Sequence, residues 1–224
     1  MSIVKQPSNG KGSLKNIQLL VNKKSSLINA QILSAFPELA KDNISWLSPL
    51  SSDSYSEYRD DDFIVRVGLN KSQINLKSFW PKQGPQWDGL ARTNSKGAVI
   101  LVEAKANIPE VVSPATSAST ASKKLISQSL ESTKRYLGIK NNIDWSGTFY
   151  QYTNRLAHLY YLRSKGVKAY LVNIYFTGDK TVNGPAKKEE WEAALTVINK
   201  YLGIGNRHRL KKYCADIFID VGQL

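Results

Sequence analysis

Apolar residues recur along the chain with two spacings, one typical of helices and the other typical of strands. The segment from Leu27 to Phe36 keeps its apolar residues on one helical face, and three later segments show the same spacing. Gly138 and Gly166 follow two of these segments and are expected to end a helix. We therefore predict helices over residues 26–40, 121–137, 148–164 and 187–202.

Two strands are predicted in the middle of the chain, on either side of residues 93–97. This segment reads Thr-Asn-Ser-Lys-Gly, which has the composition of a hairpin turn. The strand after the turn is apolar on both faces as far as Glu103, a pattern typical of a central strand. Strands are predicted over residues 86–92, 97–106, 167–176 and 216–221.

The order of these elements predicts an α/β sandwich in which a central mixed β-sheet is flanked by helices. Residues 55–68 admit two interpretations, either a helix that packs Phe63 and Val67 or a short strand over residues 63–67. The chain has 224 residues, of which 42% are hydrophobic, so it is long enough to bury one sizeable core. We expect a single domain over residues 25–224.

Several kinds of site and location are disfavoured by the composition. The one cysteine, Cys214, allows neither an internal disulfide nor a cysteine-rich zinc site. The two histidines, His158 and His208, are too few for a three-histidine zinc centre and too far apart for an H-E-x-x-H helix. Residues 1–14 contain no apolar signal segment, and the apolar run over residues 98–102 is far shorter than a membrane span. We therefore expect a soluble, cytoplasmic protein without a membrane partner.

Positive charge dominates the polar residues, with 31 Lys and Arg against 18 Asp and Glu and a formal net charge of +13. This balance favours a polyanionic partner, with nucleic acid ahead of an anionic membrane surface. Residues 1–24 contain five lysines and no acid, which predicts a flexible basic arm. The helix predicted over residues 121–137 either contacts phosphates or presents an ordinary solvated face. Its candidate phosphate contacts are Lys123, Lys124, Lys134 and Arg135.

Two charges interrupt the predicted central strand near its end. Side chains alternate along a strand, so Glu103 and Lys105 project from the same face. If the strand before the 93–97 turn pairs with this one, Asp88 comes alongside them. Two carboxylates supply the oxygen ligands that Mg²⁺ prefers, and a neighbouring lysine can orient or deprotonate water and stabilise charge on a phosphate. The alternative is a salt bridge at the end of a strand.

This arrangement resembles the PD-(D/E)XK nuclease superfamily, also called the restriction-endonuclease-like fold. The superfamily has an Asp on one strand and a Glu-x-Lys on the next, matched here by Asp88, Glu103 and Lys105, whereas two residues separate Pro85 from Asp88. The resemblance implies a hydrolase that cleaves nucleic acid, DNA by preference, with Mg²⁺ or Mn²⁺ held by Asp88 and Glu103. It also implies a further acid from a preceding helix, for which Glu57 is preferred to Glu38.

Two other functions stay open at this point. One is a catalytically inactive nucleic-acid-binding module of the same fold, and the other is a basic domain that binds an acidic protein partner. Endonuclease cleavage of both strands would need two active sites, which favours a homodimer.

Overall fold

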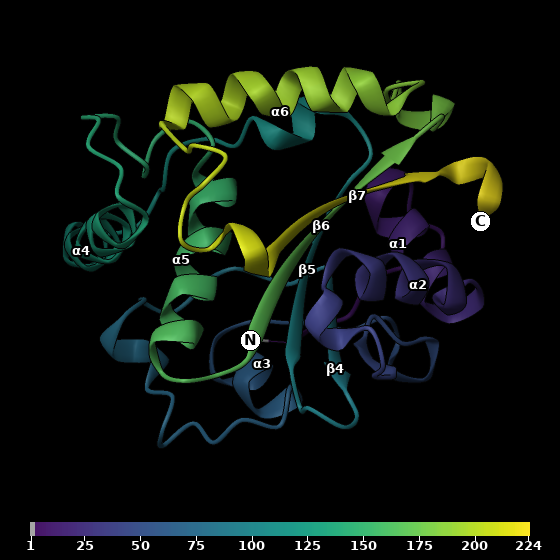
Figure 1. Ribbon diagram of the computed structural model, residues 1–224, viewed down its shortest axis with the longest axis horizontal. Helices are drawn as coiled ribbons and strands as arrows, with labels where there is room; N and C mark the ends of the chain where they lie inside the picture. Colours follow the sequence, from purple (N-terminus) through teal and green to yellow (C-terminus); the bar gives the residue numbers. More distant parts are fainter. Residues whose placement is uncertain (1–2) are drawn as a thin grey trace.

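The computed structural model describes residues 3–224 and is an α/β protein with a five-stranded mixed sheet. Across the sheet the strands follow the order β2 (Ile44–Ser48), β4 (Gly89–Thr93), β5 (Val99–Lys105), β6 (Ala169–Thr177) and β7 (Cys214–Asp220). Neighbouring strands from β2 to β5 are antiparallel, and those from β5 to β7 are parallel. The sheet lies between helices on both faces (Figure 1).

Six α-helices occur within the described residues. They are α1 (Gly12–Lys23), α2 (Ser25–Ala35), α3 (Asp60–Arg66), α4 (Thr120–Leu137), α5 (Tyr150–Ser164) and α6 (Lys188–Leu202). The turn of the chain after α4 is made by Gly138, which has a φ of 78° and therefore ends the helix in the left-handed conformation. No helix within residues 3–224 has the length and apolar character needed to cross a bilayer.

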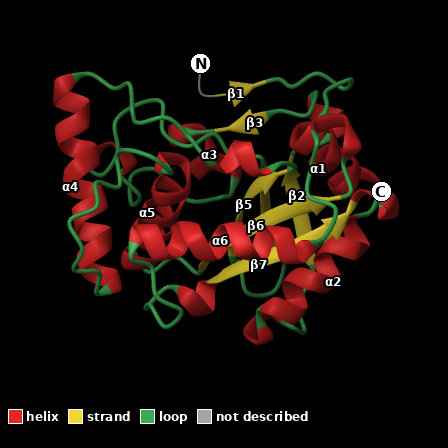
Figure 2. Ribbon diagram, turned by 90° about the horizontal axis from the view of Figure 1, so that it is seen from above, coloured by secondary structure: helices red, strands yellow, loops and turns green. Residues whose placement is uncertain are grey.

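Each face of the sheet borders its own hydrophobic core. The period-two alternation of β5 divides its residues between them, since Val102 belongs to the core shared with α1 and α2. Leu101 belongs instead to the larger core, to which α3, α4, α5 and α6 contribute. Figure 2 shows α4 and α5 on one side of the strands and α1 and α2 on the other. Alternate residues of β5 therefore face different cores and pack against different sets of helices.

The predicted α/β class and the later elements are confirmed. The helices expected over residues 121–137, 148–164 and 187–202 are α4, α5 and α6, and the predicted strand pair is β4 and β5. The last strand begins two residues earlier than expected, at Cys214.

The N-terminal region differs from the prediction. Residues 12–23 form α1 instead of a flexible arm, because Ile17 and Leu20 are fully buried against the sheet. Asn16 also donates a 2.7 Å hydrogen bond to Asp179 from the far end of the chain. The segment around Glu57 is not helical either. It forms β3 (Glu57–Tyr58), which pairs with β1 (Ile3–Val4) and precedes α3.

Candidate active site

Asp88 and Glu103 are brought together by the hairpin of β4 and β5. Gly89 pairs with Val102, so one further step of the antiparallel register sets Asp88 opposite Glu103. The Oδ2 atom of Asp88 accepts a 2.7 Å hydrogen bond from the backbone N–H of Ala104. This bond fixes the carboxylate of Asp88 against the end of β5, as the sequence pattern predicted.

Glu103 lies between two cations. Its Oε1 atom is 2.6 Å from Nζ of Lys105, and its Oε2 atom is 2.6 Å from Nε of Arg155. The side chain of Glu103 is only 8% exposed, so both ion pairs lie in a poorly solvated environment. The ammonium of Lys105 also donates a 3.2 Å hydrogen bond to Oε1 of Gln151 on α5.

Arg155 of α5 is the residue that sequence reasoning missed. Besides Glu103, its guanidinium donates 2.8 Å hydrogen bonds to the Asn154 side chain and to the carbonyl oxygen of Gln86. It also lies 5.1 Å from the centre of the Trp87 ring. A buried cation needs such partners. The sequence signal that could have identified Arg155 is its position on a helix face otherwise made of core residues.

Glu57 reaches the site from β3. Tyr58 forms an isolated bridge with Trp87, which sets β3 beside the segment that leads into Asp88. The Oε2 atom of Glu57 accepts hydrogen bonds from the side-chain amides of Gln86 at 2.5 Å and Gln6 at 2.9 Å. Glu57 is only 4% exposed.

The other sequence candidates lie outside this group. Glu38 is an exposed residue of the short 3-10 turn Pro37–Leu39, and its carbonyl oxygen accepts a hydrogen bond from Lys96. His158 is fully buried on α5, where Nδ1 lies 2.8 Å from the carbonyl oxygen of Asn154. Burial lowers the pKa of His158 to about 3, so this histidine stays neutral and is structural.

Burial and neighbouring charges have competing effects on the pKa values of the site residues. Burial, together with the nearby Glu103 carboxylate, raises the pKa of Asp88 well above its ordinary value, and burial also raises the pKa of Glu57. Burial would raise the pKa of Glu103 too, but Arg155 and Lys105 outweigh it and lower that pKa overall. For Lys105, burial acts to lower the pKa, yet Glu103 and Asp88 together raise it, so the ammonium form persists at neutral pH.

The carboxylate oxygens of the site are ligands that suit a hard cation such as Mg²⁺. In the structure, however, those of Glu103 form ion pairs. Within residues 3–224, Asp88 and Glu57 have no ion pair, and burial is the main cause of the raised pKa of each. Both carboxylate oxygens of Glu103 are engaged by Lys105 and Arg155. No group of three acids, histidines or cysteines in the described part of the chain has metal-binding geometry. A metal at Asp88 and Glu103 would therefore share Glu103 with its two cations.

The basic helix α4 presents only part of its predicted surface. Lys123, Lys124 and Arg135 are exposed. Lys134 is only 4% exposed, and its ammonium donates hydrogen bonds to Oε1 of Glu131 at 3.1 Å and to the carbonyl oxygen of Ile143 at 3.0 Å. Lys134 is therefore a structural residue and is removed from the set of candidate phosphate contacts.

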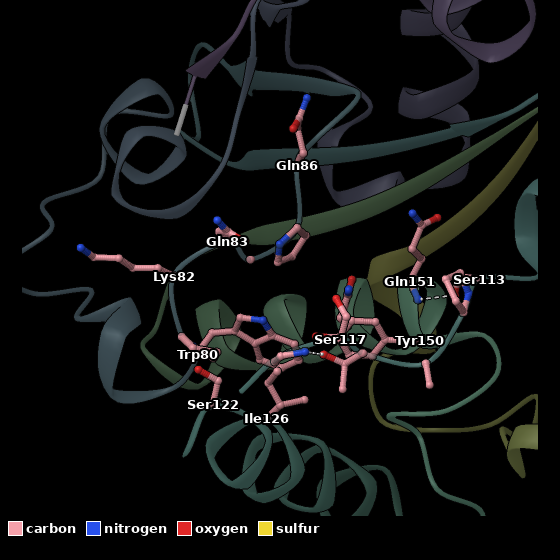
Figure 3. A pocket seen from close by; sticks show the side chains of 18 of the residues that line it. Trp80, Lys82, Gln83, Gln86, Ser113, Ser117, Ser122, Ile126, Tyr150 and Gln151 are labelled. Atoms are coloured by element: carbon pink, nitrogen blue, oxygen red, sulfur yellow. Dashed lines mark hydrogen bonds between the residues drawn. The ribbon is translucent and has the colours of Figure 1, made fainter. Parts of the chain in front are cut away.

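A cavity of about 520 Å³ adjoins the charged group. Its walls are the loops over residues 80–86 and 113–119 and the first turns of α4 and α5 (Figure 3). Arg155 and Gln151, which bind Glu103 and Lys105, also line this cavity. The charged group therefore has an open space beside it that is large enough for a small ligand.

Comparisons with protein-family models, with curated protein sequences and with solved structures found no match to this chain.

Proposed function

We propose that this protein is a metal-dependent nuclease of the PD-(D/E)XK type, with a restriction-endonuclease-like fold. The observation that carries the proposal is the convergence of Asp88, Glu103 and Lys105 from two paired strands. Supporting features are the mixed sheet covered by helices on both faces and the net charge of +13. These features together favour a polyanionic substrate, and DNA is the substrate that the resemblance favours.

Asp88 and Glu103 would hold Mg²⁺ or Mn²⁺, and the nearby Glu57, whose charge contributes to the raised pKa of Asp88, would add negative charge to the site. The bound ion would supply a Lewis acid for the scissile phosphate and would lower the pKa of its water. The hydrogen bond from Ala104 keeps one oxygen of Asp88 in place, so the second oxygen is the one offered to a ligand. Hard carboxylate oxygens of this kind suit Mg²⁺.

Lys105 would act as a positive charge beside the reacting phosphate. Its raised pKa keeps the ammonium protonated, which favours stabilisation of the developing charge over removal of a proton from water. Arg155 would be a positioning residue, because its hydrogen bonds to Glu103, Asn154 and Gln86 hold the Glu103 carboxylate in one orientation.

One observation favours a second function. Because Lys105 and Arg155 already engage both oxygens of Glu103, the same group of residues can serve as a buried salt-bridge network. In that case the protein binds nucleic acid without cleaving it.

The test is cleavage of single-stranded, duplex and branched DNA and RNA with Mg²⁺ or Mn²⁺, compared with the same reactions in EDTA. Asp88→Asn removes a proposed ligand charge, and Glu189→Gln removes an exposed carboxylate from α6 as the matched control. We expect metal-dependent cleavage by the wild type and Glu189→Gln, and a loss of at least about a hundredfold in Asp88→Asn. Binding without cleavage under every condition would support the salt-bridge alternative and overturn the nuclease proposal.

A further inference from the structure

The cavity beside Asp88 and Glu103 has a lining that suits an anionic ligand. Among the residues that line it none is acidic, whereas Lys82 and Arg155 are cations. The amino-terminal turns of α4 and α5 both border the cavity, and neither turn contains an acidic residue. Backbone N–H groups and the helix dipole make these ends favourable to a phosphate group.

The cavity also offers an aromatic surface. Trp80 and Tyr150 lie together on one wall (Figure 3), with their rings stacked at a centroid distance of 6.3 Å and an interplanar angle of 21°. Trp80 is held in place because it is almost fully buried, whereas Tyr150 is only partly buried. Trp80 therefore supports the ring of Tyr150 from behind, and Tyr150 is the ring on which a nucleobase would stack.

The shape of the cavity restricts the form of the nucleic acid. Its volume of about 520 Å³ is in the range for one small ligand such as a nucleotide. The loops over residues 80–86 and 113–119 stand on opposite sides of it. A base inside a duplex has stacked neighbours on both faces and a paired partner at its edge, so it cannot enter a pocket of this size unless it is unpaired.

The cavity and the charged group are linked by residues that they share. Gln151 lines the cavity and accepts a hydrogen bond from Lys105, and Arg155 lines the cavity and donates a hydrogen bond to Glu103. Gln86 lines it as well and bonds Glu57. A nucleotide in the cavity would therefore lie next to the phosphate that the charged group contacts.

We propose that this cavity binds one unpaired nucleotide of the substrate strand, so that the protein acts on single-stranded nucleic acid or on single-stranded tails next to a duplex. The inference rests on the proposed function, because it places that nucleotide beside the proposed cleavage site. It goes further by naming the structural class of the substrate.

The experiment measures binding in EDTA, by fluorescence anisotropy, of a labelled single strand, a blunt duplex and the same duplex with a single-stranded tail. Ala115→Trp and Ser117→Trp each place a large ring on the loop that borders the cavity. Ala193→Trp adds the same ring to the exposed face of α6 and is the matched control. Thermal unfolding of every variant confirms that it is folded.

We expect the wild type and Ala193→Trp to bind the single strand and the tailed duplex about tenfold more tightly than the blunt duplex. Ala115→Trp and Ser117→Trp should lose this preference while their affinity for the blunt duplex stays unchanged. Equal affinity of the wild type for all three ligands, or a preference that survives both cavity variants, would overturn the inference.

The two proposals fail in different ways. Tight binding and metal-dependent cleavage of the blunt duplex would overturn the inference and leave the nuclease proposal standing. A preference for the tailed duplex, lost in the cavity variants but accompanied by no cleavage, would support the cavity and overturn the nuclease proposal. No binding to any of the three ligands would overturn both.

Discussion

Nε of Arg155 lies 2.6 Å from Oε2 of Glu103, and both side chains are buried. Removing Arg155 leaves the buried Glu103 carboxylate with Lys105 as its one ion-pair partner among the described residues, in a poorly solvated environment. We predict that Arg155→Met lowers the free energy of unfolding by about 3 kcal/mol, as measured by urea denaturation. The effect of combining it with Glu103→Gln should differ from the sum of the two single effects, because the two side chains are in direct contact.

The salt-bridge network would be of little consequence if Arg155→Met left stability within about 0.5 kcal/mol of the wild type. Arg135→Met is the matched control, because Arg135 is exposed on α4. It should have almost no effect on unfolding.

Asp88 and Glu103 should respond in opposite directions to removal of their charge. Burial raises the pKa of Asp88, so its ionised form destabilises the folded state at neutral pH, and Asp88→Asn should stabilise the protein by about 1 kcal/mol in EDTA. Arg155 and Lys105 lower the pKa of Glu103 despite its burial, so Glu103→Gln should be destabilising. Urea denaturation at neutral pH measures both changes.

The pH dependence of the Asp88→Asn effect gives a second check on its cause. A folded-state pKa above the unfolded value means that stability falls as the pH rises from about 3.8, the ordinary value for Asp, through the raised one. The stabilising effect of Asp88→Asn should therefore shrink as the pH is lowered toward 3.8. An effect that stays constant with pH would show that charge is not its cause.

Substitution of the exposed lysines of α4 should change the salt dependence of nucleic-acid affinity, whereas substitution of the buried Lys134 should not. Lys123→Ala and Lys124→Ala should each reduce the slope of log affinity against log salt by about 0.9, if each lysine neutralises one phosphate. Lys134→Met should leave that slope unchanged and lower stability instead, because its ammonium bonds Glu131 and the Ile143 carbonyl. The exposed Lys187 provides the control for removal of a lysine outside α4. A slope that falls equally in all these variants would contradict a contact surface on α4.

The position of β5 depends on a close approach at Gly184. A Cβ atom there would lie well inside van der Waals contact with the carbonyl oxygen of Ala106, next to Lys105 at the end of the strand. We predict that Gly184→Ala destabilises the protein by about 2 kcal/mol and also reduces cleavage. The matched control is Gly205→Ala, where a Cβ atom would meet nothing within 4 Å. Equal stability of the two variants would show that this approach is not needed.

Much of the central sheet could be predicted from the sequence because its determinants are local. The alternation of side chains placed Glu103 and Lys105 on one face, and the turn after β4 placed Asp88 beside them. The glycine after α4 marked the end of that helix. These signals lie within a few residues of the feature that they predict.

The features that were not predicted depend on contacts between distant parts of the chain. α1 lies within a segment that has lysines and no acid, and its place in the core depends on Ile17 and on the bond between Asn16 and Asp179, 163 residues apart. The pairing of Arg155 with Glu103 spans 52 residues and needs α5 to be docked on the sheet. Local propensity and periodicity do not contain that information.

The most direct test of the proposed active site is the single-turnover rate of cleavage of the best substrate by Lys105→Met, with Lys168→Met as a control from the exposed surface. Circular dichroism would establish that both variants are folded, and saturating protein would remove differences in affinity. If Lys105 stabilises charge on the reacting phosphate, its variant should be slower by about a hundredfold to a thousandfold while Lys168→Met keeps the wild-type rate. Equal rates for the wild type and both variants would contradict the account and leave Lys105 as one half of a salt bridge.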